Sequence, residues 1–285
     1  MSMAFTTRLA RLRLDHLVYC VPGTLDDAID RFAKKTGVRP ALGGQHNGLG
    51  THNALVALGN GAYFEILARD PAQPTPARTW MGIEQLCDKP MMTAWAVAPA
   101  GVDRSLPPKK RAPPTTPSSP SKMQSFLNEL RTEVKTGRGD KPLDRAALRT
   151  ALDADVAAAG TAAMEATVAS ACAAGYDPGK PLPFSRLKPD GSTLSWTLAY
   201  NHFTAPLPGD GLVPFLIDWH SPTPADTAPS GFELVGLRAE HPDPKSVAPM
   251  LLAIGIEPFE DLQLVEGPRS RLVATLKTPK GTFDF

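Results

Sequence analysis

Short segments rich in apolar residues recur along the chain, and we expect each of them to form a β-strand. In the first segment, Leu14, His16 and Val18 alternate with the residues between them and therefore share one face. Asn60 and Gly61 separate two of the segments and are typical of a type I′ hairpin turn. The predicted strands cover residues 12–21, 52–59, 62–68, 93–99 and 212–220, a hairpin at 185–200, a strand at 233–242 and a closing hairpin at 270–285.

Apolar residues at helical spacing predict four helices. In residues 24–37, Thr24 is a suitable N-cap and Gly37 follows the last turn, so the sequence defines both ends. The other predicted helices cover residues 121–134, 143–174 and 244–256. Residues 16–38 and 234–256 share a strand–helix–glycine outline, which indicates a repeated module of one strand, one helix and further strands.

Residues 103–121 differ in composition from the rest of the chain. They are rich in proline, serine, threonine and basic residues and show no apolar periodicity, which is typical of a disordered or loop segment. We therefore expect a first module at residues 12–102 and a Pro-rich and helical insertion at 103–174. Residues 175–285 would supply the remaining strands of a second module and a C-terminal module.

Overall charge and apolar content exclude two classes of partner. The formal net charge is +1 over 285 residues, without the clustered basic face that nucleic-acid binding requires. No apolar run reaches the roughly 20 residues that span a bilayer, so we expect no membrane partner. Cys20, Cys87 and Cys172 lack CxxC spacing and are predicted to be reduced thiols of a cytoplasmic protein. The Arg-rich, acid-poor N-terminus makes organelle targeting the alternative.

The segment from residue 43 to residue 67 carries the strongest indication of chemistry. It places His46 and His52 in and beside a glycine-rich loop and Glu65 in an apolar strand. With His16 on the first strand, these side chains meet only if the strands curl around a common pocket. The segment lacks the GxGxxG pattern, because Asn53 stands at the last glycine position, so we expect no bound nucleotide.

Several motifs resemble the glyoxalase-like domain proteins of the vicinal oxygen chelate superfamily. They include LDHLVYCVP (14–22), GGQHNGLGTHNALVALG (43–59), AYFEILARDP (62–71) and LVPFLIDW (212–219), and the more specific of them are GTHNALVALG with YFEI, and LVPFLIDW. Weaker matches continue through PARTWMG, TAWAVA, SRLKPDGSTLSW, HPDP and LKTPKG. The resemblance covers nearly the whole chain except residues 103–174.

This resemblance implies an α+β fold of paired βαβββ modules, whose sheets form an open, half-barrel cup around a ligand. Metal-dependent members bind one divalent ion through a histidine on the first strand and a glutamate on the last strand of each module. Module one supplies His16 and Glu65, whereas Thr93 stands where the second histidine is expected and Asp218 near the second glutamate. His16, Glu65 and Asp218 are thus the candidate ligands for zinc, manganese, iron, nickel or magnesium, with His46, His52 and His220 as substitutes.

The remaining candidates are ligand-binding residues of a predicted small-molecule site. Such sites combine apolar walls with a few polar anchors, and we expect His46, His52, Asn53, Arg78, Trp80, Trp196 and Trp219 to line the cup, with Arg186 as a second candidate for carboxylate binding. The alternative is that these residues have no role in ligand binding: the histidines would lie on the surface, the tryptophans in the core, and the arginines in solvent. The cup is completed either within one chain or in a homodimer.

The predicted function is that of a glyoxalase-like enzyme acting on a substrate with adjacent oxygens, as a metal-assisted lyase, isomerase or oxygenase. His16 and Glu65 are the predicted catalytic residues, either as metal ligands or as an acid–base pair. The alternative is a metal-free protein that binds and sequesters a small molecule. No GxSxG, P-loop or HExxH motif supports a hydrolase or kinase.

Overall fold

In the computed structural model, the first five elements form a βαβββ unit. They are β1 (Leu12–Cys20), α1 (Leu25–Thr36), β2 (Ala41–His46), β3 (Thr51–Gly59) and β4 (Ala62–Arg69). Because α1 crosses over the sheet, β4 returns beside β1 in parallel, and the strand order is β2-β3-β4-β1. The structure describes residues 12–46, 49–73, 88–99, 161–187, 193–201, 207–258 and 262–285.

Local sequence signals fix the ends of α1 and the turn between β3 and β4. The Thr24 side chain accepts a hydrogen bond from the backbone of Asp27, and Gly37 ends the helix in the left-handed conformation with φ 83°. Asn60 and Gly61 have φ values of 52° and 76°. Positive φ at both central residues is the type I′ geometry, so the predicted hairpin is confirmed.

The glycine-rich segment is more regular than its sequence indicates. Residues 41–46 form strand β2, which pairs antiparallel with β3, where we expected a loop. Glycine lacks the side-chain packing from which strand propensity is recognised. Main-chain pairing with β3 therefore orders this segment, and the expectation of a loop over it was wrong.

A second βαβββ unit repeats the topology of the first. It consists of β5 (Met91–Pro99), a helix over residues 161–173, β6 (Pro181–Leu187), β7 (Thr193–Ala199) and β8 (Phe215–Trp219). Its strand order, β5-β8-β7-β6, matches β1-β4-β3-β2, and β5 pairs antiparallel with β1 to join the units into one eight-stranded sheet. The paired βαβββ fold is thus confirmed.

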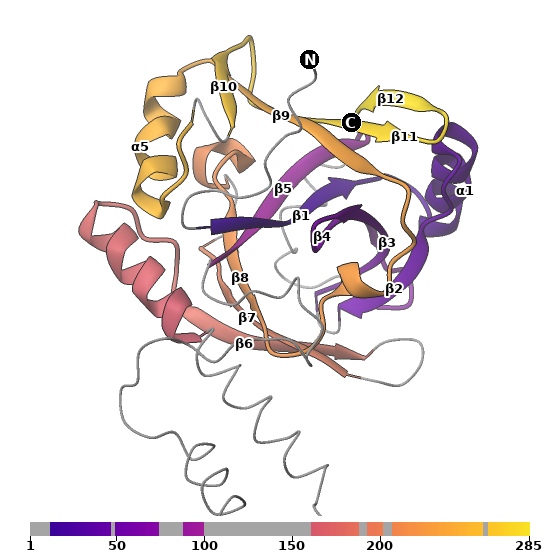
Figure 1. Ribbon diagram of the computed structural model, residues 1–285, viewed down its shortest axis with the longest axis horizontal. Coiled ribbons are helices and arrows are strands. Elements are labelled where there is room, and N and C mark those ends of the chain that lie inside the picture. Colours follow the sequence, from indigo (N-terminus) through magenta and orange to yellow (C-terminus); the bar gives the residue numbers. More distant parts are fainter. Residues whose placement is uncertain are drawn as a thin grey trace, which may run out of the picture.

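The eight-stranded sheet curls so that its two edge strands, β2 and β6, approach each other (Figure 1). The Arg186 side chain on β6 donates a hydrogen bond to the carbonyl oxygen of Gly43 on β2. This bond spans the opening between the edges. The sheet is therefore a nearly closed cup with a concave and a convex face.

The C-terminal elements form a separate four-stranded sheet. They are β9 (Glu233–His241), α5 (Pro244–Ile254), β10 (Gln263–Glu266), β11 (Arg271–Thr278) and β12 (Gly281–Asp284), in the order β10-β9-β11-β12. The predicted repeat of strand, helix and strands is present in chain order. The strand pairing differs from that of the first unit. There, β4 is the one strand of the same unit that pairs with β1, whereas β9 pairs with both β10 and β11.

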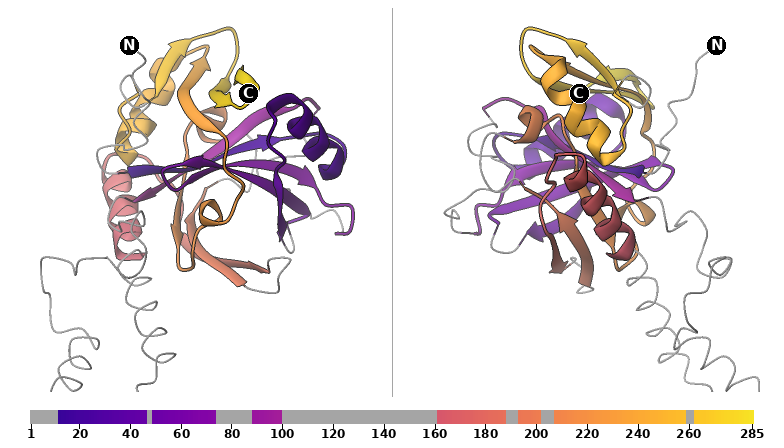
Figure 2. Two further views of the ribbon diagram at one scale, coloured as in Figure 1. Left: turned by 45° about the vertical axis from the view of Figure 1, so that its right-hand side comes forward. Right: turned by 90° about the vertical axis from the view of Figure 1, so that its left-hand side faces the viewer.

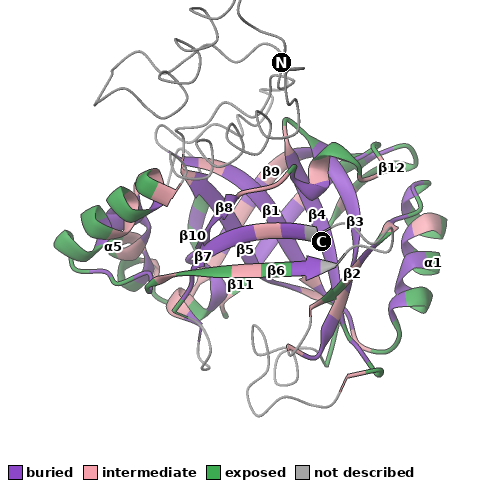
Figure 3. Ribbon diagram, turned by 90° about the horizontal axis from the view of Figure 1, so that it is seen from below, coloured by how far each residue is buried: buried purple, intermediate pink, exposed green. Residues whose placement is uncertain are grey.

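Two apolar cores lie on opposite faces of the curled sheet. The larger lies on the convex face and includes side chains from α1, α5, β9 and β11, and the smaller lies inside the cup. Figure 2 shows α5 and the helix over 161–173 along one side of the molecule and α1 along the other. In Figure 3 the strands between these helices are mostly buried, while the helices expose their outer faces.

The remaining predictions concern the redox state of the cysteines, the Pro-rich and helical insertion, and the presence of membrane-spanning helices. Cys20 is disulfide-bonded to a partner outside the described residues, which corrects the expectation of three reduced thiols; Cys172 is free and exposed.

The predicted Pro-rich segment and the helix over 121–134 lie outside the described residues. Two short 3-10 helices cover Pro208–Gly211 and Pro224–Asp226. In the described part of the chain, no helix has the length and apolar character needed to cross a membrane.

Candidate functional site

A β-bulge in β1 presents two consecutive side chains to the site. Leu14 pairs with Val97 of β5 and His16 pairs with Ala96, so Asp15 is the extra residue between them. In a regular strand, neighbouring side chains point to opposite faces. At this bulge, His16 Nδ1 instead lies 2.8 Å from Asp15 Oδ1.

Asp15 is held in place from the other half of the sheet. The indole Nε1 of Trp219, on β8, donates to both carboxylate oxygens of Asp15 at 3.1 Å, and Asp15 is fully buried. A carboxylate only accepts hydrogen bonds, so Nδ1 of His16 carries the proton in this contact. The other ring nitrogen, Nε2, is left for chemistry in the cavity.

Glu65 faces His16 from the neighbouring strand. Its register partner on β1 is Val18, and Oε2 lies 3.6 Å from His16 Nε2. The other oxygen, Oε1, accepts a hydrogen bond of 2.6 Å from Asn53 Nδ2 on β3. Gly43 of β2 makes room for Asn53, because a Cβ at this glycine would clash with Asn53 Oδ1.

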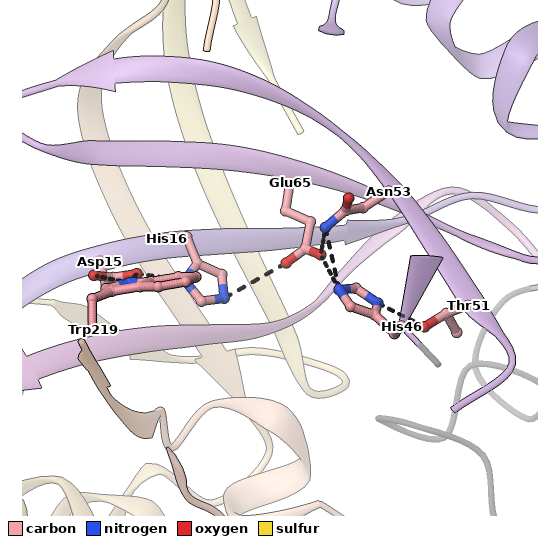
Figure 4. A network of polar contacts seen from close by, with 7 residues as sticks. All are labelled: Asp15, His16, His46, Thr51, Asn53, Glu65 and Trp219. Carbon is pink, nitrogen blue, oxygen red and sulfur yellow. Dashed lines mark hydrogen bonds and ion pairs between the residues drawn. The ribbon is translucent and has the colours of Figure 1, made fainter. Parts of the chain in front are cut away.

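His46, at the end of β2, completes a line of polar side chains that begins at Trp219 (Figure 4). Its Nδ1 lies 2.9 Å from Thr51 Oγ1, and its Nε2 lies 3.4 Å from Asn53 Nδ2 and 3.8 Å from Glu65 Oε1. Burial lowers the pKa of His46 to about 4, although Glu65 opposes this shift. His46 is therefore neutral at physiological pH and accepts from Asn53 through Nε2.

Aromatic rings enclose the imidazole of His16. The ring of Tyr63 stacks on it with centroids 4.6 Å apart and planes 15° apart, and Phe215 meets it edge-on at 5.4 Å. Burial, followed by the charges of Asp15 and Glu65, raises the pKa of Tyr63 well above its ordinary value. Its phenol thus keeps its proton. The other walls of the cavity are Leu49, Arg186, Trp196, Leu198, Ile217 and Trp219.

Seven of the residues singled out from the sequence line this cavity: His16, His46, Asn53, Glu65, Arg186, Trp196 and Trp219. His52 does not, because it shares its face of β3 with Ala54 and Val56, and that face packs into the convex core. The structure also keeps His220 out of the cavity lining, with Nε2 2.7 Å from Thr197 Oγ1. Arg78 and Trp80 lie outside the described residues.

The second half of the cup does not supply the expected metal ligands. Asp218 is buried, but its neighbours Ile217 and Trp219 line the cavity, so Asp218 points to the opposite face of β8. This corrects its place in the predicted ligand set. On β5, Ala94 and Ala96 belong to the core inside the cup, and neither has a ligating atom.

Two polar side chains of the site were missed in the sequence: Tyr63, which lines the cavity, and Asp15, which lies outside the lining and contacts His16. The signal for Asp15 was an acidic residue directly before a histidine in an otherwise apolar strand, which a buried carboxylate explains only when it is paired. Tyr63 had a weaker signal, since it alternates with Glu65 on β4.

The glyoxalase-like domain family model matches the chain twice, at residues 14–124 and 125–255. The chain belongs to the glyoxalase-like domain family. This confirms the resemblance seen in the first-unit motifs. Among curated proteins, no sequence matches this glyoxalase-like protein.

Solved structures with a similar architecture have low sequence identity. A hypothetical protein from Staphylococcus aureus is similar with a TM-score of 0.51 and 12% identity, over 96% of this chain and 98% of that one. A methylmalonyl-CoA epimerase from Mycobacterium tuberculosis gives a TM-score of 0.30 and 14% identity, over 78% and 94% of the two chains. The first likeness shows the fold alone.

Proposed function

We propose that this glyoxalase-like protein is an enzyme that moves a proton on a small organic substrate, with His16 Nε2 as the atom that takes or gives the proton. The observation that carries the proposal is the position of His16. Its Nδ1 is held by the buried Asp15 at 2.8 Å, while its Nε2 faces both the cavity and Glu65. A histidine oriented by a carboxylate is the usual arrangement of a general acid–base catalyst.

Each neighbour has a defined role in this proposal. Asp15 fixes the tautomer and orientation of His16, and Trp219 holds Asp15. Glu65 is the second proton carrier, because Oε2 lies 3.6 Å from Nε2 while Asn53 occupies Oε1. A substrate carbon beside both groups could lose a proton to one and receive a proton from the other.

The reaction class that follows is isomerisation or elimination at a carbon next to a carbonyl. Removing a proton there forms an enolate, and returning it at another position or face gives an isomer, whereas loss of a neighbouring group gives a lyase product. Substrates with adjacent oxygens suit this chemistry, because the second oxygen makes the carbon more acidic or receives the returned proton.

The donor set does not fit a protein-bound divalent ion. Of the three predicted ligands, only His16 and Glu65 face each other, and in the described residues no three His, Cys, Asp or Glu side chains are grouped for one ion. Asn53 Nδ2 also faces the lone pairs that Glu65 Oε1 and His46 Nε2 would offer to a metal. Catalytic zinc sites use three protein ligands, so no step proposed here involves a metal.

A binding and sequestration protein is the second candidate function. It is favoured by the predominance of apolar side chains in the cavity walls, among them Trp196, Leu198 and Ile217. Such walls bind small molecules with or without chemistry. The two candidates differ in whether the bound molecule exchanges protons with solvent.

Proton exchange in D₂O, followed by NMR on a panel of 2-oxo acids and 2-hydroxyketones, tests the proposal. We expect the protein to catalyse deuterium incorporation next to the carbonyl of at least one compound, and the H16Q variant to lose about 100-fold or more of this rate. The H241Q variant, in the other sheet, is the control and should keep the rate. Binding without exchange would favour sequestration. The absence of both binding and exchange would contradict the enzyme proposal.

A further inference from the structure

A buried arginine lies in the wall of the same cavity. Arg186, on the edge strand β6, is 4% exposed and lines the cavity together with His16 and Glu65. Its guanidinium donates a hydrogen bond to the carbonyl oxygen of Gly43 across the opening of the cup. Arginine has five N–H donors, so most of its hydrogen-bonding capacity is unused by this contact.

Arg186 has no carboxylate partner within the described residues. Its hydrogen bond to Gly43 is with a neutral group. The buried carboxylates of the site have other partners: Asp15 binds His16 and Trp219, and Glu65 binds Asn53. Buried charges are normally paired, because an uncompensated charge out of water is costly. Among the described residues, the cavity therefore contains a cation that no carboxylate contacts directly, although Glu65 acts on it through space.

The electrostatic environment keeps this cation charged. Burial lowers the pKa of Arg186 from its ordinary value, and the neighbouring Tyr63 and Glu65 oppose the shift. A guanidinium stays protonated throughout the physiological range. An anionic ligand group is thus the natural partner.

We propose that Arg186 binds the carboxylate of an organic acid whose apolar part lies against Trp196, Leu198 and Ile217. Guanidinium and carboxylate form paired, charge-assisted hydrogen bonds. Binding of the carboxylate does not depend on the proposed function. Only the later proton transfer rests on it, since a carboxylate held by Arg186 would bring its neighbouring carbon toward His16 and Glu65.

The chemistry of the walls favours a monocarboxylate over a phosphate. Arg186 is the one basic side chain with a fixed charge among the described lining residues, and Glu65 is close enough to influence its pKa. Glu65 and Asp15 would repel a dianion about twice as strongly as a monoanion, and Arg186 supplies only one positive charge, so a single negative charge suits the cavity better. Trp196 and Trp219, with ring centroids 5.1 Å apart, supply an aromatic wall for a phenyl or branched aliphatic group.

Calorimetric titration of the full-length protein with two matched pairs of probes tests the proposal. Phenylacetate is compared with phenylacetamide, and 3-methylbutanoate with 3-methylbutanamide, so that each pair differs in charge but hardly in shape. We expect the acid of at least one pair to bind about tenfold or more tightly than its amide. Equal affinity within both pairs, or no binding of either acid at millimolar concentration, overturns the proposal.

Variants assign the preference to one residue. We expect R186Q to remove the preference for the acid and R186K to retain only part of it, because lysine keeps the charge but not the planar pair of donors. R238Q is the matched control, since Arg238 lies on β9 and pairs with Glu240 at 3.0 Å; it should bind as the unmodified protein does. A preference that survives in R186Q overturns the role of Arg186.

Two features keep the test decisive. Arg186 also joins β6 to β2, so R186Q could lose its fold; in that case R186K and the probe pairs on the unmodified protein still decide. Proton exchange depends on His16 and is measured separately. If the unmodified protein exchanges protons but shows no preference for the acids, only this inference is contradicted. If it binds the acids without exchange, only the proposed function is contradicted.

Discussion

Trp219 and Asp15 are 204 residues apart in the chain, yet Trp219 Nε1 donates to both oxygens of the Asp15 carboxylate at 3.1 Å. Asp15 in turn fixes His16. The two βαβββ units thus have different tasks: the first carries the titratable groups, and the second supplies apolar walls, Arg186 and the indole that orients the dyad. The site is complete only when both halves of the cup are folded together.

Replacing Asp15 by asparagine should separate orientation from folding. The amide keeps the size of the side chain, but it has one accepting oxygen in place of two and no charge. It therefore cannot accept through both positions from Trp219 and His16 as the carboxylate does, and it no longer stabilises a protonated imidazole. We expect proton exchange to fall by about 10²–10⁴-fold while the fold survives with a loss of about 1–3 kcal/mol of unfolding free energy. Exchange rates and urea unfolding measure the two effects.

Asp218→Asn is the matched control, because it changes another buried carboxylate that points to the opposite face of β8. This variant should lose stability by about 1–3 kcal/mol but exchange protons at the normal rate once corrected for the folded fraction. Equal losses of exchange in D15N and D218N would show that the effect of Asp15 is structural.

Gly43 is expected to be intolerant of any side chain. A Cβ there would clash with Asn53 Oδ1 and lie 2.9 Å from Leu55 Cδ1, so Gly43→Ala must displace the amide that holds Glu65. Overpacking of this kind costs about 1–3 kcal/mol. Thermal or urea unfolding measures it, and weaker ligand binding should accompany it.

Gly236→Ala in β9 serves as the comparison, since its Cβ would have 3.7 Å to the nearest heavy atom, in Thr275. Alanine costs less backbone entropy than glycine in a strand, so this variant should be neutral or more stable by about 0.5–1 kcal/mol. A G43A protein as stable as G236A would show that β2 and Asn53 are not packed as described.

The buried, neutral His46 should make stability depend on pH. Its pKa is about 4 in the folded protein against an ordinary value of 6.5. Below pH 6.5 the unfolded chain gains a proton that the folded protein takes up only near pH 4. This contribution is therefore complete above pH 6.5 and is lost as the pH falls toward 4, by up to roughly 3 kcal/mol.

The His46→Gln variant isolates that contribution. Urea unfolding at pH 7 and pH 4.5 should show a smaller loss of stability in the variant than in the unmodified protein, because other groups titrate in both. The same pH dependence in both proteins would mean that His46 is accessible to protons in the folded state.

Metal analysis tests the conclusion that the side chains of the cavity do not bind a divalent ion. With Asp218 on the far face of β8 and Ala94 and Ala96 on β5, we expect well under one equivalent of any divalent ion in the purified protein. Dialysis against EDTA should leave proton exchange unchanged. A full equivalent of metal, retained in the unmodified protein and lost in H16Q, would contradict the metal-free chemistry proposed here.

Local sequence patterns predicted most helices and strands, because helix caps, hairpin turns and strand alternation depend on residues that are close together in the sequence. Thr24, Gly37 and the Asn60–Gly61 turn are at the predicted places. Strand β2 was not recognised, since glycines at 43 and 44 carry no propensity and its order comes from pairing with β3. The pairing of the C-terminal strands was also beyond local patterns, which do not distinguish which side of β9 a later strand joins.

For the site, alternation identified shared faces but not which face is concave. His52 was correctly grouped with Ala54 and Val56, and that shared face packs into the convex core. Asp15 was hidden for a different reason: a bulge breaks the alternation that assigns it to the other face from His16. Only the pairing of β1 with β5 reveals the bulge, and only the folded second unit brings Trp219 to it.

Nitrogen NMR of the imidazole of His16 tests the central claim most directly, because it needs no substrate. The protein is labelled with ¹⁵N-histidine, and the His16 signals are assigned by their loss in H16Q. The proposed site predicts a proton on Nδ1 at neutral pH, held by the Asp15 carboxylate at 2.8 Å, and a change of this signal in D15N. A neutral ring with its proton on Nε2 and a bare Nδ1 would contradict the dyad and, with it, the role of His16 Nε2 in proton transfer.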